Sequence, residues 1–454
     1  MYDGLMVSVS GVRGRVGEAL TPEVIARFAA GFGAWATGRG GERRIVVGRD
    51  SRVSGPMFHR ATIAALQSVG ADVIDIGLAP TPTVQLAVEH HHAAGGLAIT
   101  ASHNPIEWNA LKFIGPSGLF LDGAEGASMR AVVDGTIPRA SWDRLGVVTV
   151  DAGAIERHLA AVLALPMVDV TRIRARKFTI ALDCAHGAGG AILPALLARL
   201  GCTVSAIGLE TDGRFPRAPE PVAANLGELE RLTARVHADV GFATDPDVDR
   251  LALVSDAGRA IGEDWTLALA ARLVLRSRPG PLVVNLSTSR IVDDVAREAK
   301  AQVIRAPVGE VNVAVRMRAE RAAIGGEGNG GVILSELHLG RDAPVAVALI
   351  LQMLAEDGEP LSKVLARYPT YRIVKDKLDR PKATLDAVYA ALRTTFADAE
   401  ADGQDGLRLS WPDRWVHVRP SGTEPIVRVI AEAPTDAAAK ELVSRSRAPL
   451  DALR

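Results

Sequence analysis

The sequence predicts an α/β protein with three similar α/β/α domains and a smaller C-terminal α+β domain, arranged around a central cleft. Three observations support this prediction. The order of apolar and helical segments repeats three times, the pattern changes in the last part of the chain, and a length of 454 residues suits a chain of about three domains.

Three pairs of apolar segments form the repeat. In each pair a helical stretch separates the two segments, which are 44–48 and 70–77, 179–183 and 201–208, and 282–286 and 301–305. Apolar strands that alternate with helices indicate mixed, mostly parallel sheets with helices on both faces. Each pair leads on to a polar loop. Because open α/β sheets bind ligands at their strand ends, we expect the three loops at equivalent positions.

The C-terminal part of the chain has a different pattern. Pro381–Phe396 predicts an amphipathic helix with proline in its first turn, and Arg414–Val418 and Ile426–Glu432 predict strands that flank a loop. These elements indicate a small α+β domain. We therefore expect four domains, with the boundaries 1–150, 151–257, 258–370 and 371–454.

The first polar loop is Thr100–Pro105, which follows the apolar segment 96–99. Ser102 lies on a tight turn just after this predicted strand, where a ligand can approach it. Asn104 and Pro105 form a turn pair, because proline restricts its own φ and the residue before it. A serine before Asn-Pro serves as a helix cap or turn residue about as often as it serves a catalytic role, so the loop alone does not identify an active site.

The second loop carries three carboxylates at alternate positions, Asp245, Asp247 and Asp249. In an extended segment they lie on one side, because side chains alternate along a strand. Three carboxylates that face one point repel each other unless a cation lies there, and oxygen ligands suit Mg²⁺ or Ca²⁺. An EF-hand is excluded, since Arg250 replaces its glycine and Asp256 its closing glutamate. The alternative is a solvated acidic turn.

The third loop, residues 325–331, has five glycines in seven positions. Glycine allows the backbone to approach a ligand closely. Glu327 and Asn329 are the side chains able to bind a ligand here, and both suit hydroxyl groups. The loop matches neither the dinucleotide-binding nor the P-loop pattern.

The fourth loop, Arg419–Pro425, lies in the C-terminal domain. It combines charged, hydroxyl and free backbone amide groups that suit a phosphate, and a surface turn with incidental arginines is the alternative. The candidate ligands to phosphate are Arg419, Ser421, Gly422, Thr423 and Arg428.

These four segments, in this order, resemble the α-D-phosphohexomutase family, which has a phosphoserine loop, a metal loop, a sugar loop and a phosphate loop. Two further segments agree with the resemblance. Residues 10–14 are similar to the family's N-terminal loop, whose arginine is Arg13 here, and residues 109–113 place Lys112 near the phosphoserine. The resemblance covers nearly the whole chain.

The resemblance implies that phosphate moves between O1 and O6 of a hexose through phosphorylated Ser102 and a hexose 1,6-bisphosphate, which also serves as activator. One Mg²⁺ ion would be held by Asp245, Asp247, Asp249 and an oxygen on Ser102. Phosphoryl transfer depends on positioning and charge neutralisation, to which four further residues would contribute. They are Arg13, His103, Lys112 and Arg250.

The expected substrate is a phosphosugar, and phosphoglucosamine mutases and phosphomannomutase/phosphoglucomutases share the four loops. Many family members have a serine and a histidine where this sequence has Asn329 and Gly331. Residues 219–226 resemble phosphomannomutase-like and archaeal-type phosphoglucosamine mutase-like members, and the whole pattern is nearest to the latter. We expect conversion of glucosamine 6-phosphate to glucosamine 1-phosphate. A phosphomannomutase/phosphoglucomutase activity is the main alternative, followed by a phosphosugar-binding regulator or a phosphatase.

The composition indicates a globular protein without a bias for polyanions. The formal net charge is −1 and aromatic residues make up 4%, so we expect no nucleic-acid partner. Cys184 and Cys202 are predicted to be reduced thiols, which suits the cytoplasm. The apolar segment Ala343–Leu354 is too short to cross a bilayer, so no membrane partner is expected. The protein is expected to be a monomer or homodimer.

Overall fold

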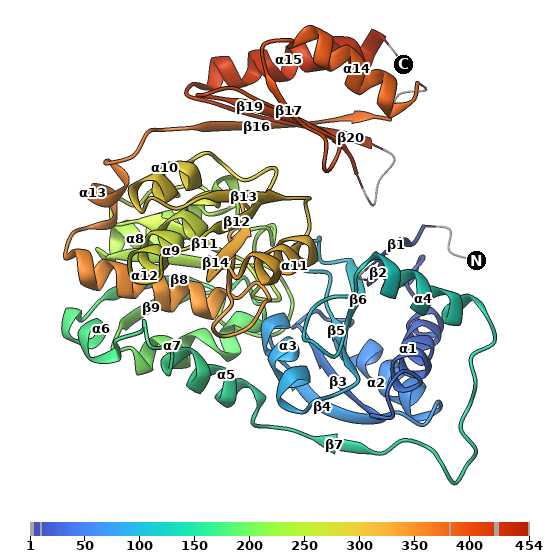
Figure 1. Ribbon diagram of the computed structural model, residues 1–454. Helices are drawn as coiled ribbons and strands as arrows, with labels where there is room; N and C mark the ends of the chain where they lie inside the picture. The colour runs from blue at the N-terminus through green and yellow to red at the C-terminus, as the bar shows by residue number, and fades with distance from the viewer. Residues whose placement is uncertain (1–3, 10, 381–382, 422–425, 453–454) are drawn as a thin grey trace.

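The computed structural model describes residues 4–9, 11–380, 383–421 and 426–452. It contains four sheets that follow one another along the chain (Figure 1). We call the regions around them the first to fourth domains. The three α/β/α domains and the C-terminal domain confirm the predicted fold class, and each sheet lies within one of the four predicted ranges.

The first domain has a seven-stranded sheet in the order β1-β2-β6-β5-β3-β4-β7. Its strands are β1 Met6–Ser8, β2 Gly11–Arg15, β3 Arg44–Arg49, β4 Asp72–Leu78, β5 Gly95–Ile99, β6 Trp108–Ile114 and β7 Val148–Val150. Its helices are α1 Pro22–Thr37, α2 Gly55–Gln67, α3 Thr81–His90 and α4 Gly123–Asp134.

The second and third domains each have a four-stranded sheet, ordered β11-β10-β8-β9 and β13-β12-β14-β15. The second domain consists of α5 Ala154–Leu163, α6 Val170–Arg176, β8 Thr179–Asp183, α7 Leu193–Arg199, β9 Thr203–Ile207, α8 Gly227–Arg235, β10 Val240–Thr244 and β11 Leu251–Ser255. The third consists of α9 Asp264–Ser277, β12 Leu282–Asn285, α10 Ile291–Glu298, β13 Val303–Ala306, α11 Glu310–Glu320, β14 Ile324–Glu327, β15 Gly331–Leu334, α12 Ala343–Asp357 and α13 Leu361–Leu365.

The three sheets share one arrangement of four strands. The strand before each polar loop (β5, β10, β14) lies beside a parallel strand (β3, β8, β12) on one side. On its other side lies the antiparallel strand that follows the loop (β6, β11, β15). All three loops therefore leave equivalent strand ends, as the repeat predicted.

The second and third domains share one apolar core, in which α9 and α12 pack against both sheets. Helix α12 is buried along most of its length because it lies inside this core. None of the helices among the described residues is both long and apolar enough to span a membrane.

The fourth domain has a five-stranded antiparallel sheet in the order β16-β20-β19-β18-β17. Its elements are β16 Arg372–Asp379, α14 Leu385–Thr395, β17 Glu400–Asp402, β18 Leu407–Ser410, β19 Trp415–Pro420, β20 Ile426–Ala433 and α15 Asp436–Ala452. Helices α14 and α15 cover one face of the sheet, away from the other domains (Figure 1).

The helix predicted from Pro381 begins later. Helix α14 starts at Leu385, because the Thr384 hydroxyl accepts a hydrogen bond from the Ala387 amide and caps it. Pro381 lies outside the described residues.

Candidate active site

A cavity of about 680 Å³ lies where the four domains meet. Each domain contributes to its lining, which includes Ser102, Arg250, Glu327 and Arg419 from the first to the fourth domain in turn. Five more of the predicted residues line it: Arg13, His103, Lys112, Asn329 and Arg428. The structure thus brings together segments that lie more than 300 residues apart in the sequence.

Ser102 lies three residues after the end of β5 in a left-handed backbone conformation, with φ of 47°. Such a conformation is unusual for serine, and here it directs the side chain out of the strand. Its hydroxyl donates to Oδ2 of Asp245 across 2.6 Å, and its amide donates to the Thr100 hydroxyl at 2.9 Å. The residue is 5% exposed, so it reaches the cavity from a buried position.

Arg52, which the sequence analysis missed, holds the serine loop in place. Its buried guanidinium donates to four main-chain carbonyl oxygens between residues 102 and 108, including that of Ser102 at 2.6 Å. Asp50 balances the charge, with 3.2 Å between Nε and Oδ2. Asp50 and Arg52 could have been identified from the sequence, because they are polar residues just after the end of β3.

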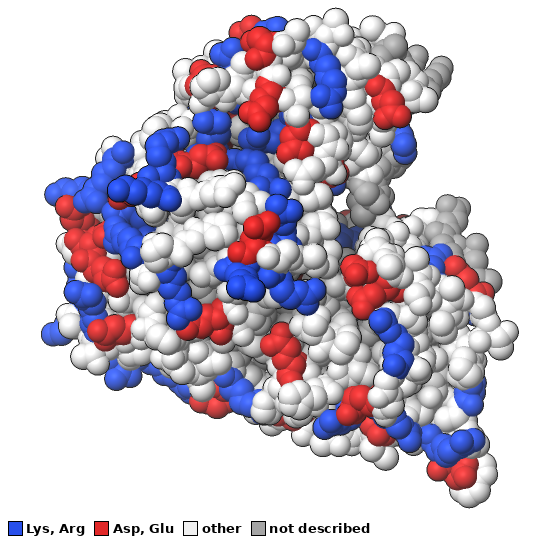
Figure 2. All heavy atoms as spheres, in the orientation of Figure 1, with Lys and Arg blue, Asp and Glu red and all other residues white. Residues whose placement is uncertain are grey.

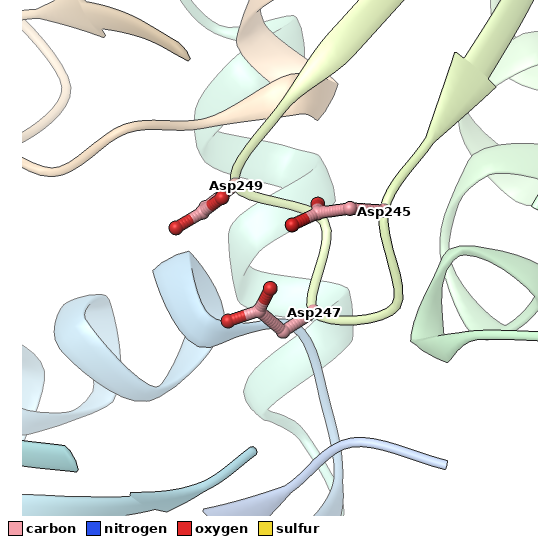
Figure 3. A group of neighbouring side chains, drawn as sticks. All are labelled: Asp245, Asp247 and Asp249. Carbon is pink, nitrogen blue, oxygen red and sulfur yellow. The ribbon is translucent and has the colours of Figure 1, made fainter. Parts of the chain in front are cut away.

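The three aspartates of the second loop converge as predicted, but for a different reason. One oxygen of each of Asp245, Asp247 and Asp249 lies within 4.8 Å of the others, and Figure 3 shows the side chains directed toward a common region. The segment is a turn and not an extended strand. Val248 has φ of 65°, and this left-handed residue reverses the chain between the second and third aspartates.

This triad has the properties of a cation site. Oδ1 of Asp247 and Oδ1 of Asp249 are buried without a hydrogen-bond partner among the described residues. Burial, followed by the charges of Asp249 and Asp247, raises the pKa of Asp245 well above its usual range. A divalent cation would satisfy the free oxygens and remove the repulsion, so the residues present fit one.

Two residues of the first domain, Lys112 and Thr81, bind Asp247 of the second domain. The Lys112 ammonium and the Thr81 hydroxyl each donate to Oδ2 of Asp247 at 2.7 Å. The ammonium also lies 3.8 Å from Oδ2 of Asp249. Burial opposes ionisation of Asp247, and Lys112 outweighs it, so the pKa of this carboxyl lies below its usual range. Lys112, which the resemblance placed near the phosphoserine, thus lies beside the triad.

Arg341, a second residue that the sequence analysis missed, joins the metal turn to the sugar loop. Its guanidinium donates to Oδ2 of Asp249 at 2.5 Å, to Oε2 of Glu327 at 2.7 Å and to Oε2 of Glu310 at 2.9 Å. All four side chains are buried. One arginine thus neutralises carboxylates from three separate segments, which no local sequence pattern reveals.

Glu327 is held rigidly at the end of β14. Oε1 accepts hydrogen bonds from Asn285 Nδ2 at 2.8 Å and from the Gly309 amide at 3.0 Å. Oε2 accepts from Arg341 and, at 3.4 Å, from Asn329 Nδ2. Although burial alone would raise its pKa, Arg341 lowers it, so Glu327 is ionised. An ionised and oriented carboxylate facing a cavity is a strong acceptor for hydroxyl groups.

The phosphate loop connects β19 and β20. Arg419 and Arg428 lie directly opposite each other on these strands and both line the cavity. Like charges in such a cross-strand pair are unfavourable, which an anion between them would reverse. Nε of Arg419 lies 2.9 Å from Oδ2 of Asp405. The Ser421 amide donates to the Ile426 carbonyl at 2.9 Å.

Two of the predicted phosphate ligands, Gly422 and Thr423, lie outside the described residues.

Three basic side chains, those of Arg13, His103 and Arg250, line the cavity together with Ser102. Arg13 Nη1 donates to Oδ1 of Asn104 at 3.0 Å, and His103 Nδ1 lies 3.4 Å from Oγ of Ser102. The Arg250 charge, together with burial and the Arg13 charge, lowers the pKa of His103 well below 6.5. His103 is therefore neutral at physiological pH and keeps a free electron pair for a proton.

Known proteins with similar sequences show to which family the chain belongs. Models of the four successive domains of phosphoglucomutase/phosphomannomutase match residues 5–135, 156–258, 262–371 and 371–448. The chain belongs to this family. The family is metal-dependent and acts on phosphosugars, and the acidic triad is able to bind a metal ion.

Two relatives and one solved structure show the extent of the similarity. A probable phosphoglucosamine mutase of Methanopyrus kandleri is 37% identical over 97% of this chain and 96% of its own length. A phosphoglucomutase/phosphomannomutase of Thermococcus kodakarensis is 38% identical over 96% of both chains. A crystal structure of a phosphoglucomutase/phosphomannomutase family protein from Burkholderia thailandensis superimposes with a TM-score of 0.84 at 26% identity, covering 99% of this chain and 98% of the other.

Proposed function

We propose that this protein is a phosphohexomutase that interconverts hexose 6-phosphates and 1-phosphates through phosphorylated Ser102 and a hexose 1,6-bisphosphate. One observation carries the proposal. The Ser102 hydroxyl lies 2.6 Å from an aspartate of the acidic triad, in a cavity that a pair of facing arginines also lines. A phosphoryl acceptor and a separate phosphate site in one cavity suit a substrate with phosphate at either end.

The cation in this proposal is Mg²⁺, held by Asp245, Asp247, Asp249 and an oxygen on phosphorylated Ser102. When bound, it would neutralise charge on the transferring phosphoryl group. Lys112 keeps Asp247 ionised and oriented, and Arg341 orients Asp249 through a hydrogen bond to its Oδ2.

The residues around Ser102 would handle charge and protons. Arg13, Lys112 and Arg250 place positive charge beside the transferring phosphoryl group, where preorganised charges act most effectively. His103 is neutral and near the Ser102 oxygen, so it suits proton transfer to or from the reacting hydroxyl group.

The rest of the cavity would hold the sugar and its other phosphate. Glu327 and Asn329 would accept and donate hydrogen bonds to hydroxyl groups. Arg419, Ser421, Gly422, Thr423 and Arg428 would bind the phosphate that does not react. After the first transfer the bisphosphate would turn over within the cavity, so the same loop serves both orientations.

The sugar that we propose is glucosamine 6-phosphate, converted to glucosamine 1-phosphate. Sequence identity to relatives does not separate the two leading alternatives. The chain is 37% identical to a probable phosphoglucosamine mutase and 38% identical to a phosphoglucomutase/phosphomannomutase. We favour glucosamine phosphate because the whole pattern, with residues 8–11 and 326–331 beside the segment 219–226, is nearest to the archaeal-type phosphoglucosamine mutase-like members.

We place the reaction in the cytoplasm. Cys184 and Cys202 are free thiols in the structure, which suits a reducing compartment. For the oligomeric state we predict a monomer or a homodimer and favour neither.

The test is a parallel assay with the 6-phosphates of glucosamine, glucose and mannose in the presence of Mg²⁺ and trace hexose 1,6-bisphosphate, followed by ³¹P NMR. We expect 1-phosphates to accumulate, fastest from glucosamine 6-phosphate. Release of inorganic phosphate would identify a phosphatase. Binding without turnover of any of the three sugars would identify a regulator.

A further inference from the structure

A second cavity, of about 550 Å³, lies between the third and fourth domains and shares no lining residue with the candidate active site. Arg290 and Arg305 line it from the third domain, and Arg408 and Ser410 line it from the fourth. Figure 2 shows that basic and acidic side chains gather where these two domains meet. The proposed function uses none of these residues.

Arg408, on β18, is the unusual member of this group. Its side chain points into the protein and the residue is only 6% exposed. Nη1 donates to the Ser410 hydroxyl at 2.5 Å, and the guanidinium carbon lies 5.1 Å from the centre of the Trp415 ring. Nε and Nη2 are buried without a partner among the described residues. A buried guanidinium with two free donors is costly unless an acceptor reaches it.

The neighbouring arginines add to this positive charge. Burial, followed by the charge of Arg305, lowers the pKa of Arg408 to about 9. Arg290 donates to the Pro412 carbonyl at 2.6 Å, and its Nε is also buried without a partner among the described residues. The protein thus places two guanidinium groups beside a third, and the carboxylates whose charges act on Arg408 are those of Asp293 and the buried Glu432.

The acidic residues of the lining have other partners or lie at the opening. Asp293 forms an ion pair with Arg305 at 2.7 Å. Asp398 accepts from the Trp411 indole at 2.7 Å, and Asp402 accepts from the amide and side chain of Gln404 at 2.9 Å each. Glu400 is exposed.

We propose that this cavity is a second anion site, which binds a phosphate group. Arg408 would donate through Nε and Nη2, Ser410 would donate its hydroxyl proton, and Arg305 and Arg290 would add positive charge. A planar guanidinium fork matches phosphate oxygens, and a charge-assisted pair satisfies both buried partners. Because the arginines come from two domains, a bound phosphate would hold the fourth domain against the third. This inference does not rest on the proposed function.

The test is equilibrium dialysis of the full-length protein with ³²P-labelled inorganic phosphate. Arg408→Met keeps an unbranched apolar stem beside Trp415 and removes the donors, and Arg419→Ala weakens phosphate binding in the candidate active site. We expect Arg408→Met to lose one phosphate site, seen as at least a tenfold weaker affinity, in both the wild-type and the Arg419→Ala background. Arg393→Gln, at an exposed position on α14, is the matched control and should bind as the wild type does.

A second measurement separates binding from a structural role. Phosphate should raise the melting temperature of the Arg419→Ala variant, and this rise should disappear in the double variant with Arg408→Met. If Arg408→Met does not fold, Arg408→Lys keeps the charge, loses the planar fork and should weaken the site several-fold. Unchanged phosphate binding in Arg408→Met or Arg408→Lys would overturn the proposal.

The source of the phosphate can be tested in the same assay. Displacement of labelled phosphate from the Arg408-dependent site by glycerol 3-phosphate at lower concentration would identify a phosphate ester as the preferred ligand. Preference for inorganic phosphate over the ester would identify the free anion. Either result supports the site, and competition by neither anion would contradict it.

Discussion

Arg341 fills the space that a side chain at position 331 would need. A Cβ atom on Gly331 would lie 2.2 Å from Cδ of Arg341 and 3.0 Å from its Cγ. Many members of the family that this sequence resembles have a histidine at this position. In this protein the absence of a side chain at Gly331 makes room for an arginine that connects Glu327 with Asp249.

This relationship predicts that even a methyl group at position 331 is harmful. Gly331→Ala should lower the melting temperature and the mutase activity, because overpacking of a buried site costs about 1–3 kcal/mol and would displace Arg341. Gly227→Ala is the matched control, since its nearest neighbouring atom would be 3.8 Å away. Equal melting temperatures and activities for the two variants would show that Arg341 moves aside freely.

Ser102→Ala should remove the phosphoryl acceptor and leave the fold intact, because Arg52 holds the loop through its main chain. We expect activity to fall by about three orders of magnitude or more, as for loss of a covalent route. Mass spectrometry of the wild-type protein should find one phosphate, on the peptide that contains Ser102. Near-normal activity of the alanine variant would contradict the proposed mechanism.

Asp247→Asn should weaken cation binding and reduce kcat more than it raises KM, because the cation acts on the reacting phosphate. EDTA should abolish wild-type activity and Mg²⁺ should restore it. Isothermal titration with Mg²⁺ and steady-state kinetics check both points, with the exposed residue Asp143, changed to Asn, as control. Full activity of EDTA-treated protein would exclude the triad as the required metal site.

Arg419→Ala should weaken phosphosugar binding roughly ten- to two-hundred-fold, because a charge-assisted hydrogen bond contributes about 1.5–3 kcal/mol. The loss should be similar for 1-phosphate and 6-phosphate substrates, since one loop would bind the distal phosphate in both orientations. KM values for both substrates measure this, with Arg393→Ala as a control from the same domain. A defect restricted to one of the two substrates would require another phosphate site.

Asp264 makes the stability of the protein depend on pH. Burial raises its pKa from 3.8 to about 8, so between these values the folded state binds a proton that the unfolded state has lost. Stability should therefore fall as pH rises through this window, by at most about 1.4 kcal/mol per pH unit. Asp264→Asn keeps an acceptor for the Ser289 amide and should melt at higher temperature than the wild type near pH 8.

The two proteins should melt alike near pH 4, where the Asp264 carboxyl of the folded wild type is protonated and uncharged, as the amide of the variant is at every pH. Thermal unfolding across the pH range measures the difference. A constant difference between the two proteins at all pH values would rule out this titration.

Much of the candidate site was predictable because its residues lie in short, contiguous loops. Ser102, the three aspartates, Glu327 and Arg419 each follow or end a strand, and the local pattern indicates both the turn and the chemistry. Only the convergence of the aspartates was explained wrongly. Their spacing suggested an extended segment, and the left-handed Val248 instead makes a turn, a choice that side-chain periodicity does not reveal.

The sequence by itself determined the fold class, the three repeated α/β domains and the loops that carry the chemistry, because apolar periodicity and turn residues are local properties. Only the tertiary structure decided how distant charges pair. Arg52 binds a loop some fifty residues away, and Arg341 joins three carboxylates from two domains. Buried charges must be satisfied by whichever partners the packed domains bring near, and that depends on the whole fold.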